Sequence, residues 1–343
     1  MPTSRSLATG VTETLGAAFS TPFVSLFVAL LVSVGLLAIV ARMHPLEAVA
    51  GDVATRRYAP ERSALGITAA AVIALFALEN VVRGYVVDLA DVVSWWRYAL
   101  PLAGASLGLF VVVVNVLVRG TTQPRAPGAS VARRTWTTFG PRWGIVATCI
   151  SFVALLVTTV CAGVVSSPDA HGRYIWLAIP VPNEADVDPV RVWFYGWEYG
   201  LPVLVCLGAL SVVTWSVLHF NASRPYIRPE TVTDEKRFRR EIAASTVRVA
   251  CATTLIALAG AWRFIAQAGT VSQLAVGAED HGQPFEATWR YAEFAIAAGW
   301  LAPVLEIAGF VLLFFVMAGA ARRTGRRSVR RRADAVARET AMP

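Results

Sequence analysis

Four ionisable residues lie within long apolar runs of the sequence: Glu79, Arg83, Arg263 and Glu306. If those runs cross a bilayer, each charge near the membrane centre costs at least about 2.5 kcal/mol, so it must be paired or serve a function. A guanidinium group presents a planar fork of N–H donors that fits a carboxylate or a phosphate. The four residues therefore indicate a binding site for a small anion, with Glu306 as a counter-charge or a titrating group.

The spacing of these residues gives them different expected partners. Glu79 and Arg83 are four positions apart on one helical face, so an internal ion pair without a ligand is the plainer interpretation. Arg263 has no acid one helical turn away, so its partner must come from another segment or from a ligand. Glu306 is the best candidate, because side chains tilt towards the N-terminus of a helix and the two segments run in opposite directions.

The letters WWRYA at residues 95–99 return almost unchanged as TWRYA at residues 288–292. Trp and Tyr favour the membrane–water interface, where Arg reaches the headgroups, so interface anchoring is the ordinary explanation. The functional alternative is an outer gate formed by two related clusters. The residues concerned are Trp96, Arg97, Tyr98, Trp289, Arg290 and Tyr291.

The elements that must position these side chains are membrane-spanning helices. Of the 343 residues, 56% are hydrophobic and only 16% are charged. Several apolar runs reach the roughly 20 residues that a helix needs to cross a bilayer. We therefore predict an all-α polytopic membrane protein with seven transmembrane helices. The predicted spans lie near Phe19 to Ala41, Ala64 to Val87, Tyr98 to Val118, Trp143 to Val165, Leu201 to Phe220, Val247 to Ala268 and Tyr291 to Ala320.

The connections between the spans alternate in basic charge. Residues 42–62, 119–142 and 224–240 and the tail from Arg322 are basic, and the segments between them contain few Arg. The positive-inside rule predicts that the basic set is cytoplasmic, with the N-terminus outside and the C-terminus inside. The first span is longer than the apolar core of a cleaved signal peptide. Because Lys236 is the only lysine among many Arg, Ala and Val residues, we expect a bacterial cytoplasmic membrane.

Aligning the chain with itself at an offset of 180 residues indicates a duplication. The pattern predicts a parallel 3+1+3 internal repeat, in which spans one to three correspond to spans five to seven. The loops 42–62 and 224–240 should then each lead by a short helix into the next span. Convergent loop composition is the alternative. The matched positions include Pro22 with Pro202, Arg57 with Arg237, Glu61 with Glu241 and Arg83 with Arg263.

Two resemblances to known families follow from these patterns. The 3+1+3 plan with an outer N-terminus resembles the SWEET sugar transporters, in topology only, because the triplets lack a matching Pro-Gln signature. This resemblance implies transport by two parallel repeats. The letters ENVVRG, Glu79 to Gly84, resemble the EExxxR core of CAAX-type intramembrane proteases. Asn80 replaces the second acid and no Phe-xxx-His pair follows, so the second carboxylate for activating a water is missing.

These features divide the chain into six regions. Prolines within residues 166–198 argue against one long helix there, and we expect a short re-entrant or surface-lying piece. The regions are an outer N-terminal tail (1–18), a three-helix repeat (19–118), a basic loop with a linker helix (119–165), an outer aromatic and Pro-rich loop (166–198), a second three-helix repeat (199–320) and a basic cytoplasmic tail (321–343).

Other chemistry is sparse in the sequence. The cysteines fall inside predicted spans, the histidines lack metal-ligand spacing, and there is no P-loop. We therefore expect no cofactor and no metal. The basic tail should attract anionic lipid, and it lacks the interleaved aromatics that favour nucleic acid. The expected partners are the lipid bilayer, a small anionic solute, and a membrane protein partner or a second copy of the chain.

Three functional classes fit this sequence. The leading class is a transporter or permease for a small anionic or amphiphilic solute bound between the two repeats. The alternatives are a non-catalytic membrane subunit, such as an assembly or partner protein of a larger complex, and an intramembrane enzyme that acts on a lipid-linked substrate. Enzymatic activity is the least favoured class. The deciding observation is whether Arg83, Arg263 and Glu306 line one cavity that water can enter.

Overall fold

The computed structural model describes residues 22–43, 52–87, 92–120, 135–180, 189–226, 231–271, 273–275, 284–286 and 288–340. The predicted tail at residues 1–18 and the centres of two basic loops, residues 44–51 and 121–134, lie outside the described residues, as do the side chains of residues 322–343. The helices are α2 (Pro22–Met43), α3 (Asp52–Val81), the π-helix η1 (Val82–Val86), α4 (Leu100–Gly120), α5 (Arg142–Val165), α6 (Trp197–Ser223), α7 (Val232–Gly269) and α8 (Ala292–Thr340).

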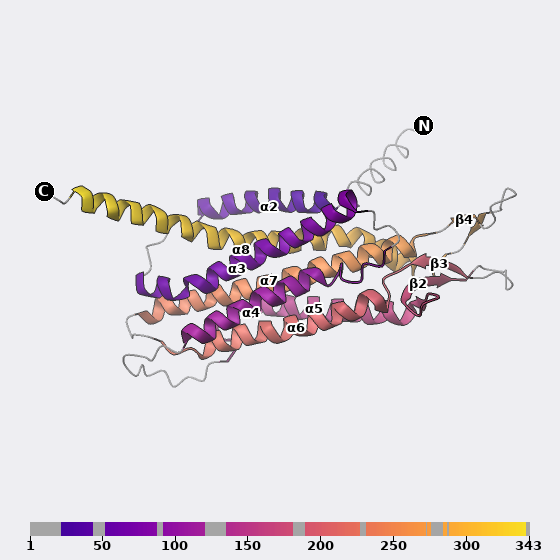
Figure 1. Cartoon of the computed structure of the whole chain (residues 1–343), viewed down its shortest axis with the longest axis horizontal. Coiled ribbons are helices and arrows are strands. Elements are labelled where there is room, and N and C mark those ends of the chain that lie inside the picture. The colour runs from indigo at the N-terminus through magenta and orange to yellow at the C-terminus, as the bar shows by residue number, and fades with distance from the viewer. Residues whose placement is uncertain are drawn as a thin grey trace, which may run out of the picture.

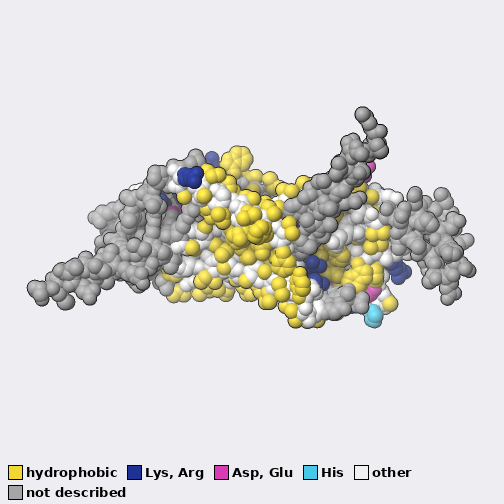
Figure 2. Space-filling view, turned by 90° about the horizontal axis from the view of Figure 1, so that it is seen from above, with side chains coloured by type: hydrophobic (Ala, Val, Ile, Leu, Met, Phe, Trp, Pro, Cys, Tyr) yellow, Lys and Arg dark blue, Asp and Glu magenta, His cyan; other side chains and the backbone are white. Residues whose placement is uncertain are grey.

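The helices form an elongated bundle (Figure 1). In the part of the chain that the structure describes, seven helices are long and apolar enough to cross a membrane, which confirms the predicted number. Large apolar side chains such as Phe27, Ile150 and Val205 are exposed, and hydrophobic atoms cover the middle of the face seen in Figure 2. Outward apolar side chains suit contact with lipid. The chain therefore has the architecture of a multi-pass membrane protein.

Helix α7 lies at the centre of the bundle. In its most apolar stretch 78% of the residues are buried, against 17% in α2. It contacts α3, α4, α5, α6 and α8. Small residues explain the tight packing, because at Gly309 of α8 an added Cβ would come within 2.8 Å of the carbonyl oxygen of Ala252 on α7. Helices can approach closely where such small residues line their interface.

Two helices begin earlier than the sequence predicted. Helix α3 begins at Asp52 and α7 at Val232, more than ten residues before the apolar runs at Ala64 and Val247. In both basic loops the helix that leads into the next span is continuous with that span, because the spanning helices themselves extend to Asp52 and Val232. The extensions are helical because one face of each is buried, with Tyr58 on α3 packed against α7.

The segment after α5 forms a small sheet, so the all-α prediction is wrong here, and strands take the place of the expected re-entrant or surface-lying piece. Strands β1 (Ser167–Pro168), β2 (Tyr174–Ile179) and β3 (Val190–Trp193) pair antiparallel in that order. Aromatic and β-branched residues favour strands, and Trp176 lies opposite Trp193 with ring centroids 5.6 Å apart. A second pair, β4 (Gln273–Ala275) and β5 (Pro284–Glu286), follows α7.

The two ends of the bundle differ in character. We call the end that carries β1–β3 the sheet end, and the other end, where α3 and α7 begin and α6 finishes, the basic end. In Figure 1 the sheet end is on the right and the basic end on the left. The two candidate sites described below lie towards these opposite ends.

Candidate functional site

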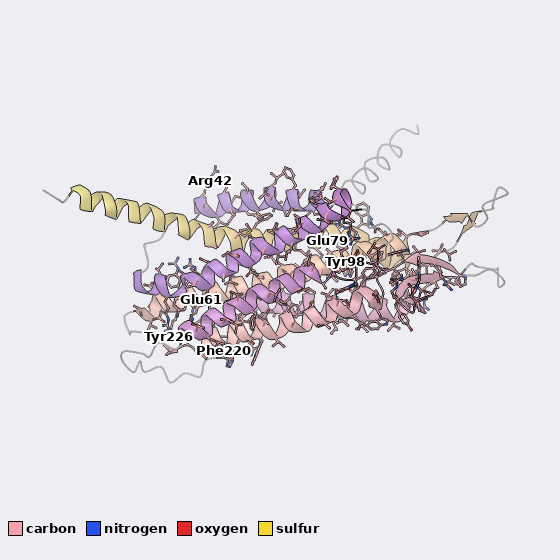
Figure 3. All side chains as sticks on the ribbon, viewed as in Figure 1. Arg42, Glu61, Glu79, Tyr98, Phe220 and Tyr226 are labelled. Atoms are coloured by element: carbon pink, nitrogen blue, oxygen red, sulfur yellow. The ribbon has the colours of Figure 1, made fainter. Side chains whose placement is uncertain are left out.

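A cavity of about 530 Å³ lies in the half of the bundle nearer the sheet end. It is formed where α3 ends, α4 begins and α7 approaches its last turns, with α8 completing the wall. Figure 3 shows Glu79 and Tyr98 close together in this half of the bundle. The cavity brings together all four charged residues that the sequence singled out: Glu79, Arg83, Arg263 and Glu306.

Glu79 lies between two arginines. The Arg83 Nε donates a hydrogen bond of 2.9 Å to Glu79 Oε1, which is the expected pair one helical turn apart. The Arg97 Nε lies 4.0 Å from the other carboxylate oxygen, Oε2. Arg83 belongs to η1, a π-helix that replaces the last turn of α3. Single π-turns are rare in proteins, but those that occur often lie at functional sites. They turn the side chains that follow in a different direction from those of the preceding α-helix.

Arg263 and Glu306 form the second ion pair of the cavity. The Arg263 Nη2 donates a short hydrogen bond to Glu306 Oε2, from α7 to the neighbouring helix α8. Both side chains are largely buried, with exposed fractions of 17% and 4%. The sequence proposed this partner for Arg263. Glycines permit close contacts on both helices: Gly309 of α8 faces α7, and Gly260 of α7 faces the ring of Tyr98.

The cavity carries an excess of positive charge. Its lining contains three arginines, Arg83, Arg97 and Arg263, and two glutamates. One guanidinium charge is therefore left over. The Nη2 atom of Arg83 is buried and has no hydrogen-bond partner among the described residues. A buried N–H donor of a charged group is costly to leave unsatisfied, so water or an anion in the cavity would complete it.

Aromatic rings form the floor of this cavity. Tyr98 packs edge-on against Tyr195 and Tyr199, and it stacks on Phe264 at 5.9 Å between centroids. The ring of Tyr98 also lies against Gly260, where no side chain intervenes. Burial raises the pKa values of Tyr98 and Tyr195 above the usual value of 10. Both phenols therefore stay protonated at neutral pH and can donate hydrogen bonds.

The two WRY motifs occupy matching positions but different environments. Each lies directly before a spanning helix, α4 in the first case and α8 in the second. In the first motif Arg97 and Tyr98 line the cavity. In the second motif Trp289 is the buried member and packs against Phe194, while Arg290 stacks on the exposed Tyr291.

A second charged cluster lies buried at the basic end, and the sequence analysis missed it. Arg224 Nη2 donates to Glu61 Oε1 at 2.7 Å and to the Val116 carbonyl at 3.0 Å. The Tyr58 hydroxyl donates to Glu235 Oε2 at 3.1 Å and accepts from Arg239 Nε at 3.2 Å. We call this set the buried network. Its members are Arg57, Tyr58, Glu61, Arg224, Glu235 and Arg239, and all are less than a tenth exposed.

The buried network joins four helices at one end of the bundle. Arg57, Tyr58 and Glu61 come from α3, Glu235 and Arg239 from α7, Arg224 follows α6, and the Val116 carbonyl belongs to α4. Figure 3 shows Glu61 and Tyr226 at this end, far from Glu79. One sequence signal pointed towards it: the alignment of the chain with itself at an offset of 180 residues matches Arg57 and Glu61 on α3 with positions near the start of α7.

Comparison with protein-family models, with curated proteins and with solved structures finds no significant match for this chain. Within the part that the structure describes, no group of three or more His, Cys, Asp and Glu side chains has the arrangement of a metal site.

Proposed function

We propose that the protein is a transporter or permease for a small anionic solute that binds in the cavity beside Arg83, Arg97 and Arg263. The observation that carries this proposal is the convergence of three guanidinium groups on one cavity with only two carboxylates to balance them. Pockets of several hundred Å³ hold small molecules. The aromatic floor and the phenol of Tyr98 would contact the less polar part of the solute.

The contrast between the two ends supports transport over a purely structural role. The cavity approaches the sheet end, whereas the buried network ties α3, α4, α6 and α7 together at the basic end. A site open towards one face and closed towards the other is what alternating access requires of one of its states. In this proposal the buried network is the closed gate, and breaking its ion pairs accompanies opening towards the basic end.

The internal repeat and the orientation are part of the same proposal. In the proposed repeat α2, α3 and α4 correspond to α6, α7 and α8, and a twofold axis should give each contact between two helices a counterpart between their equivalents. The contact of α4 with α6 has its counterpart in that of α8 with α2, and the contact of α3 with α8 has its counterpart in that of α7 with α4, which supports the repeat. The rings of Tyr58 and Phe238, 180 positions apart, stack between α3 and α7. The basic end would face the bacterial cytoplasm under the positive-inside rule.

Cysteine labelling tests the orientation. In a cysteine-free background, a single cysteine replaces the exposed His171 at the sheet end, and a second variant carries one at the exposed Arg237 at the basic end. A membrane-impermeant maleimide added to intact cells should label only the first variant, and permeabilised cells should show both. Labelling of the second variant in intact cells contradicts the proposed orientation.

Anion binding tests the function. Purified protein in detergent is melted with acetate, glutamate, phosphate, a monovalent cation series and a neutral sugar at constant ionic strength. At least one anion class should raise the melting temperature in a saturable way. The rise should disappear in Arg97→Gln and persist in Arg290→Gln, which removes the same residue type from the other WRY motif. Proteoliposomes should then exchange that anion, and absence of both stabilisation and exchange would refute the proposal.

One observation favours the enzymatic alternative. Glu79 and Glu306 line the same cavity, and two acids near one substrate can serve as an acid and a base. Each of them is paired with an arginine, so neither carboxylate can approach a substrate without giving up its ion pair. Hydrolysis of a lipid-linked substrate that is lost in Glu79→Gln, with binding of small anions absent, would favour the enzyme.

A further inference from the structure

A second cavity, of about 410 Å³, lies at the basic end between α3, α7 and α8. It is separate from the cavity beside Arg83, Arg97 and Arg263, which we call the solute cavity, and shares no lining residue with it. One face of α7 supplies most of its wall, through residues at helical spacing from Arg237 to Arg248. We call it the basic cavity. Its charged lining residues are Arg62, Arg237, Arg240, Glu241 and Arg248.

The basic cavity has a larger charge excess than the solute cavity. Four arginines line it against one glutamate. Arg62 and Arg237 both approach Glu241, at 3.8 Å and 3.5 Å, so this single carboxylate is already shared. Arg240 and Arg248 are exposed and form no ion pair with any residue in the described ranges. Two guanidinium groups thus face the cavity without an acid to neutralise them.

The opposite wall of the basic cavity is apolar. Leu65 of α3 and Phe315 and Val316 of α8 line it, and Gly319 and Ala320 leave room beside them. The apolar stretch of α8 ends at Ala321, and Arg322 follows in the sequence. The cavity therefore spans the level where lipid-facing surface gives way to water, which is where headgroups lie in a bilayer.

We propose that the basic cavity binds the phosphate group of an anionic phospholipid. The apolar wall favours a lipid over a free phosphate. Arg240 and Arg248 would hold the phosphate by charge-assisted hydrogen bonds, for which the guanidinium fork is well suited. Leu65, Phe315 and Val316 would contact the upper part of an acyl chain. A free anion would gain nothing from that apolar wall, whereas a lipid covers both halves of the cavity.

The position of this site gives the lipid a means to act on the protein. Arg62 also stacks over Phe238, whose ring packs on Tyr58 of the buried network. A bound lipid would therefore hold together the ends of α3 and α7 that carry the network. The proposal does not depend on the identity of any transported solute.

Melting of purified protein in mixed detergent micelles tests this site. Dioleoylphosphatidylglycerol should raise the melting temperature in a saturable way, and dioleoylphosphatidylcholine, which carries the same phosphate with a compensating cation, should raise it much less. The double variant Arg240→Gln, Arg248→Gln should lose at least about half of the rise, because it removes the two guanidinium groups that would hold the phosphate. Arg142→Gln, an exposed arginine at the same end outside the cavity, is the control and should keep the full rise.

Two further results complete the test. The double variant should melt at the wild-type temperature without added lipid, since both side chains are exposed, and native mass spectrometry should show fewer retained phosphatidylglycerol molecules. If inorganic phosphate at equal concentration stabilises the protein as strongly as the lipid, the assignment to lipid is overturned. If the double variant and Arg142→Gln respond to phosphatidylglycerol as the wild type does, no phosphate site exists there.

Discussion

Arg263 on α7 donates a hydrogen bond to Glu306 on α8, so each of these charges is neutralised by the neighbouring helix and not by a residue of its own. The pair lies in the wall of the solute cavity, where 4% of the Glu306 side chain is exposed. Removing one partner leaves an uncompensated charge in a largely buried position. The pair therefore couples the packing of α7 on α8 to the charge of the cavity.

A double-mutant cycle tests this coupling. Arg263→Gln and Glu306→Gln should each reduce stability by about 3 kcal/mol, and the double variant should recover a large part of the combined loss. Thermal melting of the wild type and the three variants in one detergent provides the measurement. Losses that simply add in the double variant would mean that the two residues act independently.

Replacement of Gly260 should disturb the aromatic floor of the solute cavity. An added Cβ would come within 2.8 Å of the Tyr98 ring, so the ring must move. We expect Gly260→Ala to cost about 1–3 kcal/mol of stability and to weaken anion stabilisation. The matched control is Gly208→Ala on α6, where nothing lies within 4 Å. Equal melting temperatures and equal anion responses in the two variants would argue against the described packing of Tyr98.

Removal of the Tyr58 hydroxyl should weaken the buried network. Tyr58→Phe takes one partner from Arg239 and one from Glu235, both of which are fully buried. The expected loss of stability is about 1–3 kcal/mol, the cost of leaving buried polar groups unsatisfied. Tyr174→Phe, a half-exposed tyrosine on β2, serves as the control. Denaturation by heat or by a harsher detergent should separate the two variants.

The turn between β1 and β2 should respond to pH through Asp169. Desolvation acts to raise the pKa of this carboxyl, but hydrogen bonds from Arg173 and from the His171 backbone outweigh it, and the pKa falls below its usual value of 3.8. A depressed folded-state pKa gives stability that is present above the unfolded pKa and lost as pH falls through the folded one. The melting difference between the wild type and Asp169→Asn should be constant from about pH 7 to pH 5 and shrink below about pH 4. A difference that persists unchanged at lower pH would exclude this role.

The spanning helices and the lining of the solute cavity were predictable for one physical reason. A charge within an apolar run is costly in lipid, so Glu79, Arg83, Arg263 and Glu306 stood out before any fold was known. Their opposite helix directions then predicted the pairing of Arg263 with Glu306. The seven spans could be predicted from the lengths of the apolar segments alone. A helix that crosses a bilayer needs apolar side chains along its whole length, because water is excluded there.

The buried network was not predictable by the same reasoning. Its charged members Arg57, Glu61, Glu235 and Arg239 belong to segments whose composition matches solvated basic loops. They are buried only because partners more than 160 residues away in sequence close over them, as Arg224 does over Glu61. Local pattern carries no information on such contacts. The offset of 180 residues was the one sequence feature that linked these segments.

For the sheet and the WRY motifs, local composition was not enough to predict the structure. Prolines in residues 166–198 correctly argued against one long helix, but pairing of Trp176 with Trp193 was invisible until the strands were placed together. Tyr98 and Tyr291 occupy the same place in matching motifs, yet Tyr98 is 7% exposed and Tyr291 43% exposed. The helices packed around each motif, and not the motif itself, therefore decide how far its side chains are buried.

The central position of α7 has a consequence for how the protein is made. Helices leave the ribosome in chain order, so α2 to α6 enter the membrane before the helix that most of them pack against has been synthesised. Until Val232–Gly269 has been synthesised, Tyr58 on α3 lacks its two hydrogen-bond partners, Glu235 and Arg239. Insertion and assembly are therefore separate events for this chain, because α3, α4, α5 and α6 are made before the helix on which they pack.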